Sequence, residues 1–278
     1  MLEIIEKNRC FKGFQEVYSH LSKSNKCNMK FALYTPDTNE KIPILFFLSG
    51  ITCDEQNFIQ KSGFQKFASD KKIALIIPDT SPRGENIKNS EDYKLGKGAG
   101  FYLNAITDEW KQHYNMYDYI ADELPTIIEN NFNFDTNRIG IFGHSMGGGG
   151  AIQIALKNEK IFKSISALSP ICSLFQSDFS AMAIKEYLNS NSEIISKYDP
   201  ISLIKNSVVR KDIIKIDVGL NDEYLKDLYI SEFEQECIKH DQKIDISKHK
   251  GYGHNYYFVQ TFIEDHIEFH YKNLRNKI

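Results

Sequence analysis

The segment that decides the fold of this chain is Gly143-His144-Ser145-Met146-Gly147. The residues before it, Arg138–Phe142, have the composition of a buried strand, and Ala151–Leu156 after it have that of a helix. G-x-S-x-G between a strand and a helix is a nucleophile elbow. The turn is so tight that its serine stands above the sheet edge, and the flanking positions must lack bulk. We therefore expect Ser145 to be a catalytic nucleophile.

The composition is that of an ordinary globular protein. The 278 residues are 41% hydrophobic and 26% charged, with a formal net charge of -3. This length suits one large domain, and we expect a single domain over residues 1–278. Because the chain is slightly acidic and its basic residues are scattered, we expect neither nucleic acid nor an anionic membrane as a partner.

Targeting and cysteine signals are weak. Acidic residues interrupt Met1–Lys7, so this stretch lacks the apolar core of a signal peptide. The apolar run near Ile42–Leu48 is far too short to span a membrane. We therefore expect a cytoplasmic protein with free thiols and no metal site, since the five cysteines are widely spaced and no two form a C-x-x-C pair: Cys10, Cys27, Cys53, Cys172 and Cys237.

Strand-type and helix-type segments alternate from the first third of the chain onward. Continuous apolar runs at residues 44–48 and 73–77 indicate strands covered on both faces. Pro125 should kink or divide the helix in which it lies. The pattern predicts an α/β fold with a mostly parallel central sheet, helices on both faces, and ligands beyond the carboxyl ends of the strands. We expect strands at residues 13–20, 30–34, 44–48, 73–77, 138–142, 164–168, 213–218 and 243–248, and helices at residues 117–131, 151–156, 181–188, 225–240 and 258–274.

A serine nucleophile needs a base, and the base needs an acid to orient it. On this scaffold the acid and the histidine follow the serine in that order, each after a later strand. The loop Gly219–Glu223 offers Asp222, and the loop His249–Asn255 offers His254 between glycine and the last helix. We expect Ser145, Asp222 and His254 to form the catalytic triad.

Other residues compete for these roles. Asp217 lies within the strand pattern rather than after it, and Asp199 before Pro200 is typical of a turn or a helix cap. Glu223 remains the nearest alternative acid. His249 is too close to its strand to reach the elbow, and His144 points away if its neighbour occupies the apex.

The developing oxyanion needs two backbone N–H donors. One should be Met146, directly after the nucleophile, and we expect the other to be Ile51 in the loop Leu48–Cys53. The glycines Gly147–Gly150 weaken a helix, which indicates close approach to neighbouring backbone. Lys94–Gly100 lacks the spacing of a phosphate loop and is interpreted as a flexible loop near the mouth of the site.

Several longer segments resemble the S-formylglutathione hydrolase (esterase D) family of α/β-hydrolases, and the similarity extends from Phe14 to Tyr271. The resemblance places the family nucleophile, acid and base on Ser145, Asp222 and His254. It implies cytoplasmic hydrolysis of S-formylglutathione to glutathione and formate in formaldehyde detoxification, without metal or organic cofactor, by an enzyme that is often a homodimer. The matching segments are Leu48–Cys53, Asp79–Gly84, Gly98–Tyr102, Met116–Tyr117, Glu123–Pro125, Phe142–Gly148, Ser169–Cys172 and Gly253–Phe258.

The chain departs from the family pattern at three positions. Gly149 replaces a usual histidine, Tyr93 a common tryptophan, and Asn221 an acid that often precedes the catalytic aspartate. No triad residue is lost, so the departures concern substrate fit and rate rather than the reaction.

Two further hypotheses concern the size of the acyl group in the substrate and the thiol of Cys53. Formyl is the smallest acyl group, so the acyl pocket should be tight, with side activity on short-acyl esters only. Cys53 lies two residues after Ile51, and we expect its alkylation to block the site although Cys53 is not catalytic; a plain buried thiol is the alternative.

The residues leave other functions open. A short-chain carboxylesterase or an acyltransferase could use the same scaffold, and a catalytically silent binding protein is a contrasting class that the complete triad disfavours. The residues that bind the glutathione carboxylates are undetermined, with candidates at Lys61, Lys94 and Lys97.

Overall fold

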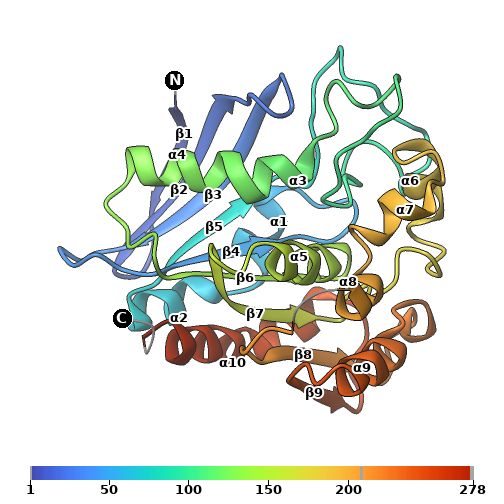
Figure 1. The fold of residues 1–278 in the computed structure, drawn as a ribbon. Helices are drawn as coiled ribbons and strands as arrows, with labels where there is room; N and C mark the ends of the chain where they lie inside the picture. Colours follow the sequence, from blue (N-terminus) through green and yellow to red (C-terminus); the bar gives the residue numbers. More distant parts are fainter. Residues whose placement is uncertain (1, 207–208, 276–278) are drawn as a thin grey trace.

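In the computed structural model, which describes residues 2–206 and 209–275, nine strands form one sheet in the order β1-β2-β3-β5-β4-β6-β7-β8-β9 (Figure 1). Neighbouring strands from β5 to β9 are parallel, whereas β1, β2, β3 and β5 pair antiparallel in succession. The mostly parallel α/β sheet expected from the sequence is therefore confirmed. The strands are β1 (Glu3–Arg9), β2 (Gly13–Leu21), β3 (Asn28–Pro36), β4 (Ile44–Leu48), β5 (Ala74–Pro78), β6 (Ile139–His144), β7 (Phe162–Leu168), β8 (Ile214–Gly219) and β9 (Ile244–His249).

Helices cover both faces of this sheet. The core of one face joins α1, α2 and α10 to the strands, and the core of the other joins them to α4, α5, α8 and α9 (Figure 1). The α-helices are α1 (Glu55–Lys61), α2 (Phe64–Lys71), α3 (Met116–Asp118), α4 (Leu124–Asn131), α5 (Met146–Lys157), α6 (Ala181–Glu186), α7 (Ser192–Ser196), α8 (Pro200–Asn206), α9 (Ile230–Lys239) and α10 (Tyr256–Arg275). A π-helix, Tyr119–Glu123, and a 3-10 helix, Leu225–Asp227, complete the helical segments of the described residues.

The central strands are apolar because both faces are covered. Every residue of β4 and of β5 is buried, as the continuous apolar runs predict. Polar side chains in a strand covered on both faces would lose their contact with water without gaining a partner. β4 lies between β5 and β6 and is parallel to both, so the loop that follows β4 lies at the same sheet edge as Ser145.

The helix expected at residues 117–131 is divided into three pieces. Pro125 lies in the first turn of α4, where its missing N–H breaks no bond within that helix. The preceding turn widens into the π-helix Tyr119–Glu123, which accommodates the interruption. The helix expected at residues 225–240 is likewise interrupted, because Tyr229 adopts a left-handed backbone with φ 54° between the 3-10 helix and α9.

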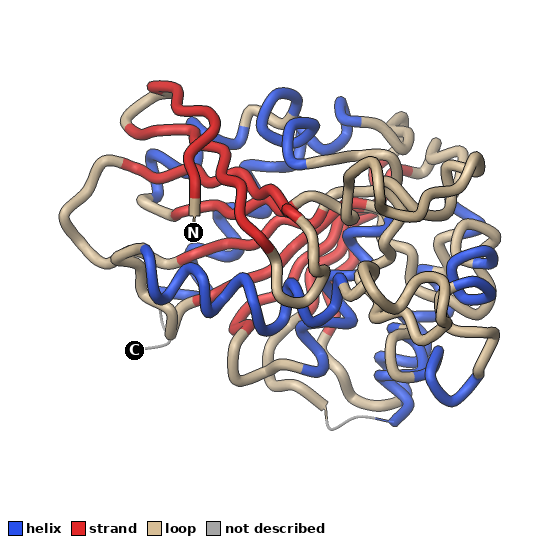
Figure 2. The backbone as a smooth tube through the Cα atoms, turned by 90° about the horizontal axis from the view of Figure 1, so that it is seen from above, coloured by secondary structure: helices blue, strands red, loops and turns tan. Residues whose placement is uncertain are grey.

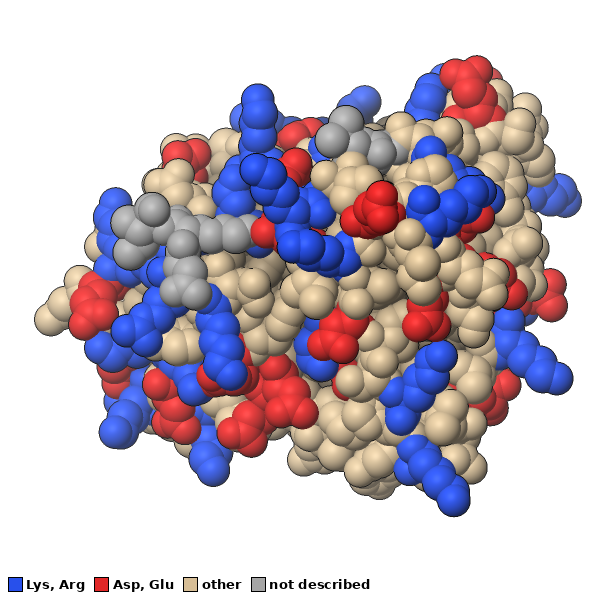
Figure 3. Space-filling view, turned by 60° about the horizontal axis from the view of Figure 1, so that its bottom comes forward, with Lys and Arg blue, Asp and Glu red and all other residues tan. Residues whose placement is uncertain are grey.

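Loops gather at one end of the sheet. In the view of Figure 2 the long tan segments lie on the side away from both marked termini. On the face seen in Figure 3, Lys and Arg side chains are interspersed with Asp and Glu, so no extended region of one sign forms there. Within the described residues no helix is long and apolar enough to cross a membrane.

Candidate active site

The turn between β6 and α5 has the geometry of a nucleophile elbow. Ser145 has φ 58° and ψ -121°, a strained conformation for a residue with a side chain. A Cβ on Gly143 would overlap the backbone of Gly147, and a Cβ on Gly147 would overlap the carbonyl of Leu48. The glycines on both sides therefore permit the turn, and the close approach expected of the glycine run is present between α5 and β4.

Asp222 and His254 meet although 32 positions separate them in the sequence. Asp222 follows β8 and His254 precedes α10, and His254 Nδ1 lies 2.7 Å from Asp222 Oδ2. Burial alone would raise the pKa of Asp222. The hydrogen bond and the charge of His254 outweigh burial and, with a hydrogen bond from the Tyr224 N–H, hold that pKa below its usual value. The carboxylate is thus ionised at neutral pH and holds the imidazole in one orientation.

The imidazole of His254 lies beside the elbow. Its ring centroid is 4.7 Å from that of His144, the residue immediately before Ser145. Among the described residues no hydrogen bond joins Ser145 Oγ to His254, a contact that in enzymes without substrate is commonly long and tightens in the complex. Burial, and then the nearby His254, holds the pKa of His144 well below its usual value. His144 is therefore neutral and does not oppose a positive charge on His254.

The loop after β4 is held rigidly against the elbow. Thr52 N–H donates to the Gly98 carbonyl at 2.8 Å and Cys53 N–H donates to the Gly50 carbonyl at 3.3 Å. In the described part of the chain the Ile51 N–H has no such acceptor, and Met146 begins α5, where a helix leaves its first N–H groups free. The N–H groups of Ile51 and Met146, which the sequence predicts as oxyanion donors, thus have no backbone acceptor within the described residues, and Gly50, next to Ile51, lies against Ser145.

Tyr102 and Arg83 hold this loop in place, although neither was assigned a role from the sequence. The Tyr102 hydroxyl donates to the Ser49 carbonyl at 2.8 Å, and Arg83 Nη2 donates to the Cys53 carbonyl at 3.0 Å. Arg83 is itself held by Asp79, with Nε 2.6 Å from Oδ2. Both Tyr102 and Arg83 belong to segments that resemble the family, so the sequence does mark them as family residues. That they hold this loop can be recognised only from their contacts in the folded structure.

The competing acids have other partners. Asp217 binds His249, with Oδ1 2.6 Å from Nε2. Asp199 accepts from the N–H groups of Leu174 and Ser202, as expected of a helix cap. Glu223, the remaining alternative, accepts the backbone N–H of His254 at 3.2 Å rather than contacting its imidazole. The structure therefore favours Asp222 as the partner of the base.

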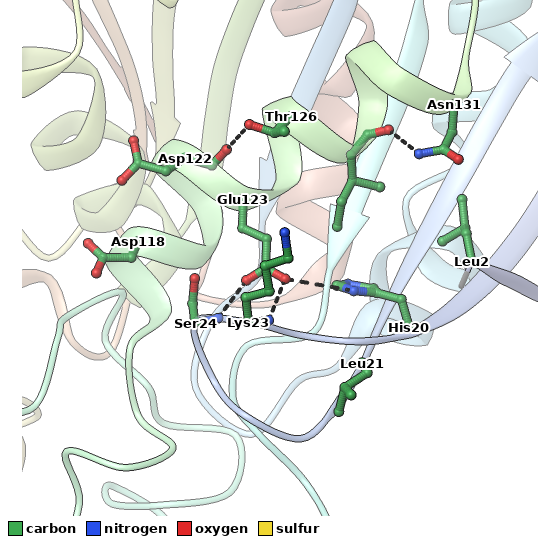
Figure 4. Close-up of a pocket in the computed structure, with 11 residues that line it drawn as sticks. Leu2, His20, Leu21, Lys23, Ser24, Asp118, Asp122, Glu123, Thr126 and Asn131 are labelled. Atoms are coloured by element: carbon green, nitrogen blue, oxygen red, sulfur yellow. Dashed lines mark hydrogen bonds and ion pairs between the residues drawn. The ribbon is translucent and has the colours of Figure 1, made fainter.

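A cavity that none of these residues lines lies between the β2–β3 turn and the segment from α3 to α4 (Figure 4). Its volume is about 640 Å³. Glu123 occupies its centre but accepts the N–H groups of Lys23 and Ser24 and the Ser22 hydroxyl, so its carboxylate holds the turn together. The hydroxyl-bearing residues Ser24 and Thr126 and the imidazole of His20 line this cavity, but the Thr126 hydroxyl donates to the Asp122 carbonyl and His20 contacts the Tyr119 hydroxyl. Among the described residues no hydroxyl of this cavity is hydrogen-bonded to His20, and the cavity is not the candidate active site.

A nucleophile elbow followed by an Asp–His pair from two later strands defines the class: a serine hydrolase of the α/β-hydrolase fold. The family model of putative esterases matches residues 22–269. A solved S-formylglutathione hydrolase from Agrobacterium tumefaciens is 39% identical, with 98% of this chain and 99% of that chain covered and a TM-score of 0.95. The chain belongs to the S-formylglutathione hydrolase family of esterases, which confirms the resemblance of its segments.

More distant structures share the fold. The fluorophosphonate-binding serine hydrolase F of Staphylococcus aureus is 19% identical, with a TM-score of 0.76 and coverage of 94% of this chain and 99% of that one. An S-formylglutathione hydrolase from the same organism is 18% identical, with a TM-score of 0.70 and coverage of 98% and 99%.

Proposed function

We propose that this protein is a serine thioesterase that hydrolyses S-formylglutathione to glutathione and formate, as a step of formaldehyde detoxification in the cytoplasm. The observation that carries the proposal is the 2.7 Å contact between His254 Nδ1 and Asp222 Oδ2 beside the elbow of Ser145. The 39% identity to an S-formylglutathione hydrolase over nearly the whole chain supports the choice of substrate.

Acylation begins when His254 Nε2 takes the hydroxyl proton of Ser145 and the serine oxygen attacks the thioester carbonyl. The N–H groups of Ile51 and Met146 stabilise the oxyanion of the tetrahedral intermediate. Its collapse breaks the carbon–sulfur bond, and glutathione leaves after the sulfur receives the proton from His254. Asp222 stabilises the imidazolium throughout.

Deacylation repeats these steps with water. His254 takes a proton from a water molecule, which attacks the formyl ester of Ser145. The same two N–H groups stabilise the second oxyanion. Formic acid leaves and ionises to formate in water, and the serine regains its proton from the imidazolium.

A preference for small acyl groups is part of the proposal. The void between Phe101, Met146 and Ile171 has a volume of about 10 Å³, room for roughly one water molecule. Neither Ser145 nor His254 lines this void, so the preference for formyl and acetyl over long acyl groups follows from the substrate that we propose.

The proposal is tested by measuring kcat/KM for S-formylglutathione beside p-nitrophenyl acetate and p-nitrophenyl octanoate, with Ser145→Ala as the control. We expect S-formylglutathione to be the best substrate, octanoate the poorest, and Ser145→Ala to lose at least about 10³-fold in kcat. A preference for acetate over S-formylglutathione would instead indicate a general short-chain carboxylesterase. Transfer of the acyl group to an added alcohol in preference to water would indicate an acyltransferase. Cleavage of octanoate as fast as acetate would contradict the tight acyl pocket.

A further inference from the structure

A cavity of about 670 Å³ adjoins the Asp–His pair and is large enough for a tripeptide. It lies between the loop after β8 and two segments that are distant in the sequence, residues 93–94 and 178–179. Asp222 is one of its lining residues, although its carboxyl group is fully buried against His254. The cavity thus adjoins the catalytic pair through the loop after β8 and through Tyr224, whose ring packs against His254. Its main lining side chains are Tyr93, Lys94, Phe179, Leu220, Tyr224 and Lys226.

Aromatic rings lead from the catalytic base to one ammonium group. Tyr224 packs edge-on against His254 with centroids 5.2 Å apart, and Phe179 packs edge-on against Tyr224 at 4.9 Å. Lys94 Nζ lies 5.1 Å from the Phe179 centroid and 6.0 Å from that of Tyr93. Cation–π contacts of this kind hold the Lys94 ammonium in place at the rim of the cavity. The side chain therefore loses little further conformational entropy when a ligand binds.

The other two lysines considered from the sequence are placed differently. Lys61 is exposed and lies over the Tyr256 ring, with Nζ 5.5 Å from its centroid. Lys97 is exposed and is not part of the cavity wall. The structure therefore distinguishes Lys94 from Lys61 and Lys97.

The cavity carries both signs of charge. Lys94 and Lys226 share its wall with four acidic residues, Asp178, Asp222, Glu223 and Asp227. Two of these carboxylates have partners within the protein, because Asp222 contacts His254 and Asp227 accepts the Ser177 hydroxyl and the Asp178 N–H. A wall with cations alone would favour a simple anion, whereas this mixture suits a molecule with carboxylates and an ammonium. The peptide part of glutathione has both.

We propose that this cavity binds the peptide part of the leaving thiol, with Lys94 as the partner of one carboxylate. The proposal rests on the proposed function, because it gives the leaving group of that reaction its binding site. Phe179 and Tyr224 provide the apolar wall along which the peptide lies, and Lys94 determines specificity without touching the reacting atoms.

The test compares Lys94→Gln with Lys94→Arg and with Lys97→Gln, a matched charge loss three residues away. Loss of a charge-assisted hydrogen bond should raise KM for S-formylglutathione about tenfold or more in Lys94→Gln. The ratio of kcat/KM for S-formylglutathione to that for p-nitrophenyl acetate should fall by the same factor. Lys94→Arg should restore most of this ratio, and Lys97→Gln should match the wild type.

A ratio in Lys94→Gln within about twofold of the wild type would overturn the proposal. If the wild type does not hydrolyse S-formylglutathione, the proposed function fails instead. The cavity is then tested with reduced glutathione as an inhibitor of p-nitrophenyl acetate hydrolysis. Inhibition that is about tenfold weaker in Lys94→Gln supports the cavity site, and equal or absent inhibition in both proteins overturns it.

Discussion

Two partly buried Asp–His contacts of nearly equal length should have opposite consequences when the acid is changed to asparagine. Asp222 Oδ2 lies 2.7 Å from His254 Nδ1, and Asp217 Oδ1 lies 2.6 Å from His249 Nε2. Only the first contact includes the residue that we propose as the base. We predict that Asp222→Asn removes activity with little loss of stability, and that Asp217→Asn does the reverse.

The effect on activity follows from the second oxygen of Asp222. Its Oδ1 accepts the Tyr224 N–H at 2.9 Å, so in Asp222→Asn the amide oxygen would keep this bond and turn the amide nitrogen toward His254. The Nδ1 atom of His254 would then have to accept, and its proton would move to Nε2, the atom that must take the proton of Ser145. The wrong tautomer should lower kcat by about 10³–10⁴-fold, or roughly 4–5.5 kcal/mol.

The effect on stability follows from the other partners of Asp217. Lys215 Nζ lies 2.6 Å and His266 Nε2 3.2 Å from its Oδ2. In Asp217→Asn the poorly exposed Lys215 would lose its counter-charge, which should cost about 3 kcal/mol and lower Tm by roughly 6–12 °C. We expect kcat to stay within about tenfold of the wild type, since no reacting group is removed.

The pH dependence of this stability has a defined sign. Burial alone would raise the pKa of Asp217, but His266, Lys215 and His249 hold it below its usual value. A group whose folded pKa is lowered stabilises the protein above its unfolded pKa, near 3.8, and this contribution disappears as the pH falls further. The gap in Tm between wild type and Asp217→Asn should therefore be full at pH 7 and shrink in acid.

The assay combines steady-state kinetics on p-nitrophenyl acetate with thermal unfolding for the two variants and a third, Glu223→Gln. If Glu223→Gln lost as much kcat as Asp222→Asn is expected to lose, the assignment of the acid would be wrong. An Asp222→Asn protein that kept a tenth of wild-type kcat would refute the tautomer argument.

Two further predictions concern the loop that contains Ile51. Tyr102→Phe removes the donor to the Ser49 carbonyl, so kcat should fall about tenfold with little change in KM, measured by steady-state kinetics; an unchanged kcat would contradict a role in holding the loop. Burial raises the pKa of the Cys53 thiol above 9.0, so inactivation by iodoacetamide should accelerate as the pH rises toward that value. Cys53→Ser should keep activity and resist the reagent, and a variant that stayed equally sensitive would disprove the hypothesis.

The sequence predicts the central strands well, because a short continuous apolar run between turn residues indicates a strand covered on both faces, as in β4 and β5. It does not predict β1, because every side chain of Glu3–Arg9 is exposed and the strand adds only an edge to the sheet. Helix α1 also escaped prediction, although its capping box was readable: Asp54 accepts from Gln56 N–H, and the Asn57 side chain accepts the Asp54 N–H. Its seven residues are too few for a periodic pattern to stand out.

The candidate site likewise has a part that the sequence predicts and a part that it does not. Ser145, Asp222 and His254 could be selected from their order and their positions after strands, because parallel strands present their carboxyl ends at one edge. The cavity that Lys94 lines could not be predicted in this way. Its walls come from loops that are distant in the sequence, and how these loops lie together depends on packing rather than on a periodic sequence pattern. Tyr224 illustrates the difference: its ring packs against both Phe179 and His254, contacts that no spacing in the sequence encodes.

The three departures from the family pattern lie around the catalytic residues without removing any of their contacts. Asn221 Oδ1 accepts the Gly251 N–H at 2.8 Å and so ties the acid loop to the loop of His254, a bond that needs an acceptor but no charge. At Gly149 a Cβ would overlap the Ile171 carbonyl, so a histidine there would require the segment after β7 to move away from α5. Tyr93 lies on the wall of the cavity that we assign to the leaving thiol. We therefore expect these three departures to affect how the substrate is held, while the Asp222–His254 contact beside Ser145 is kept.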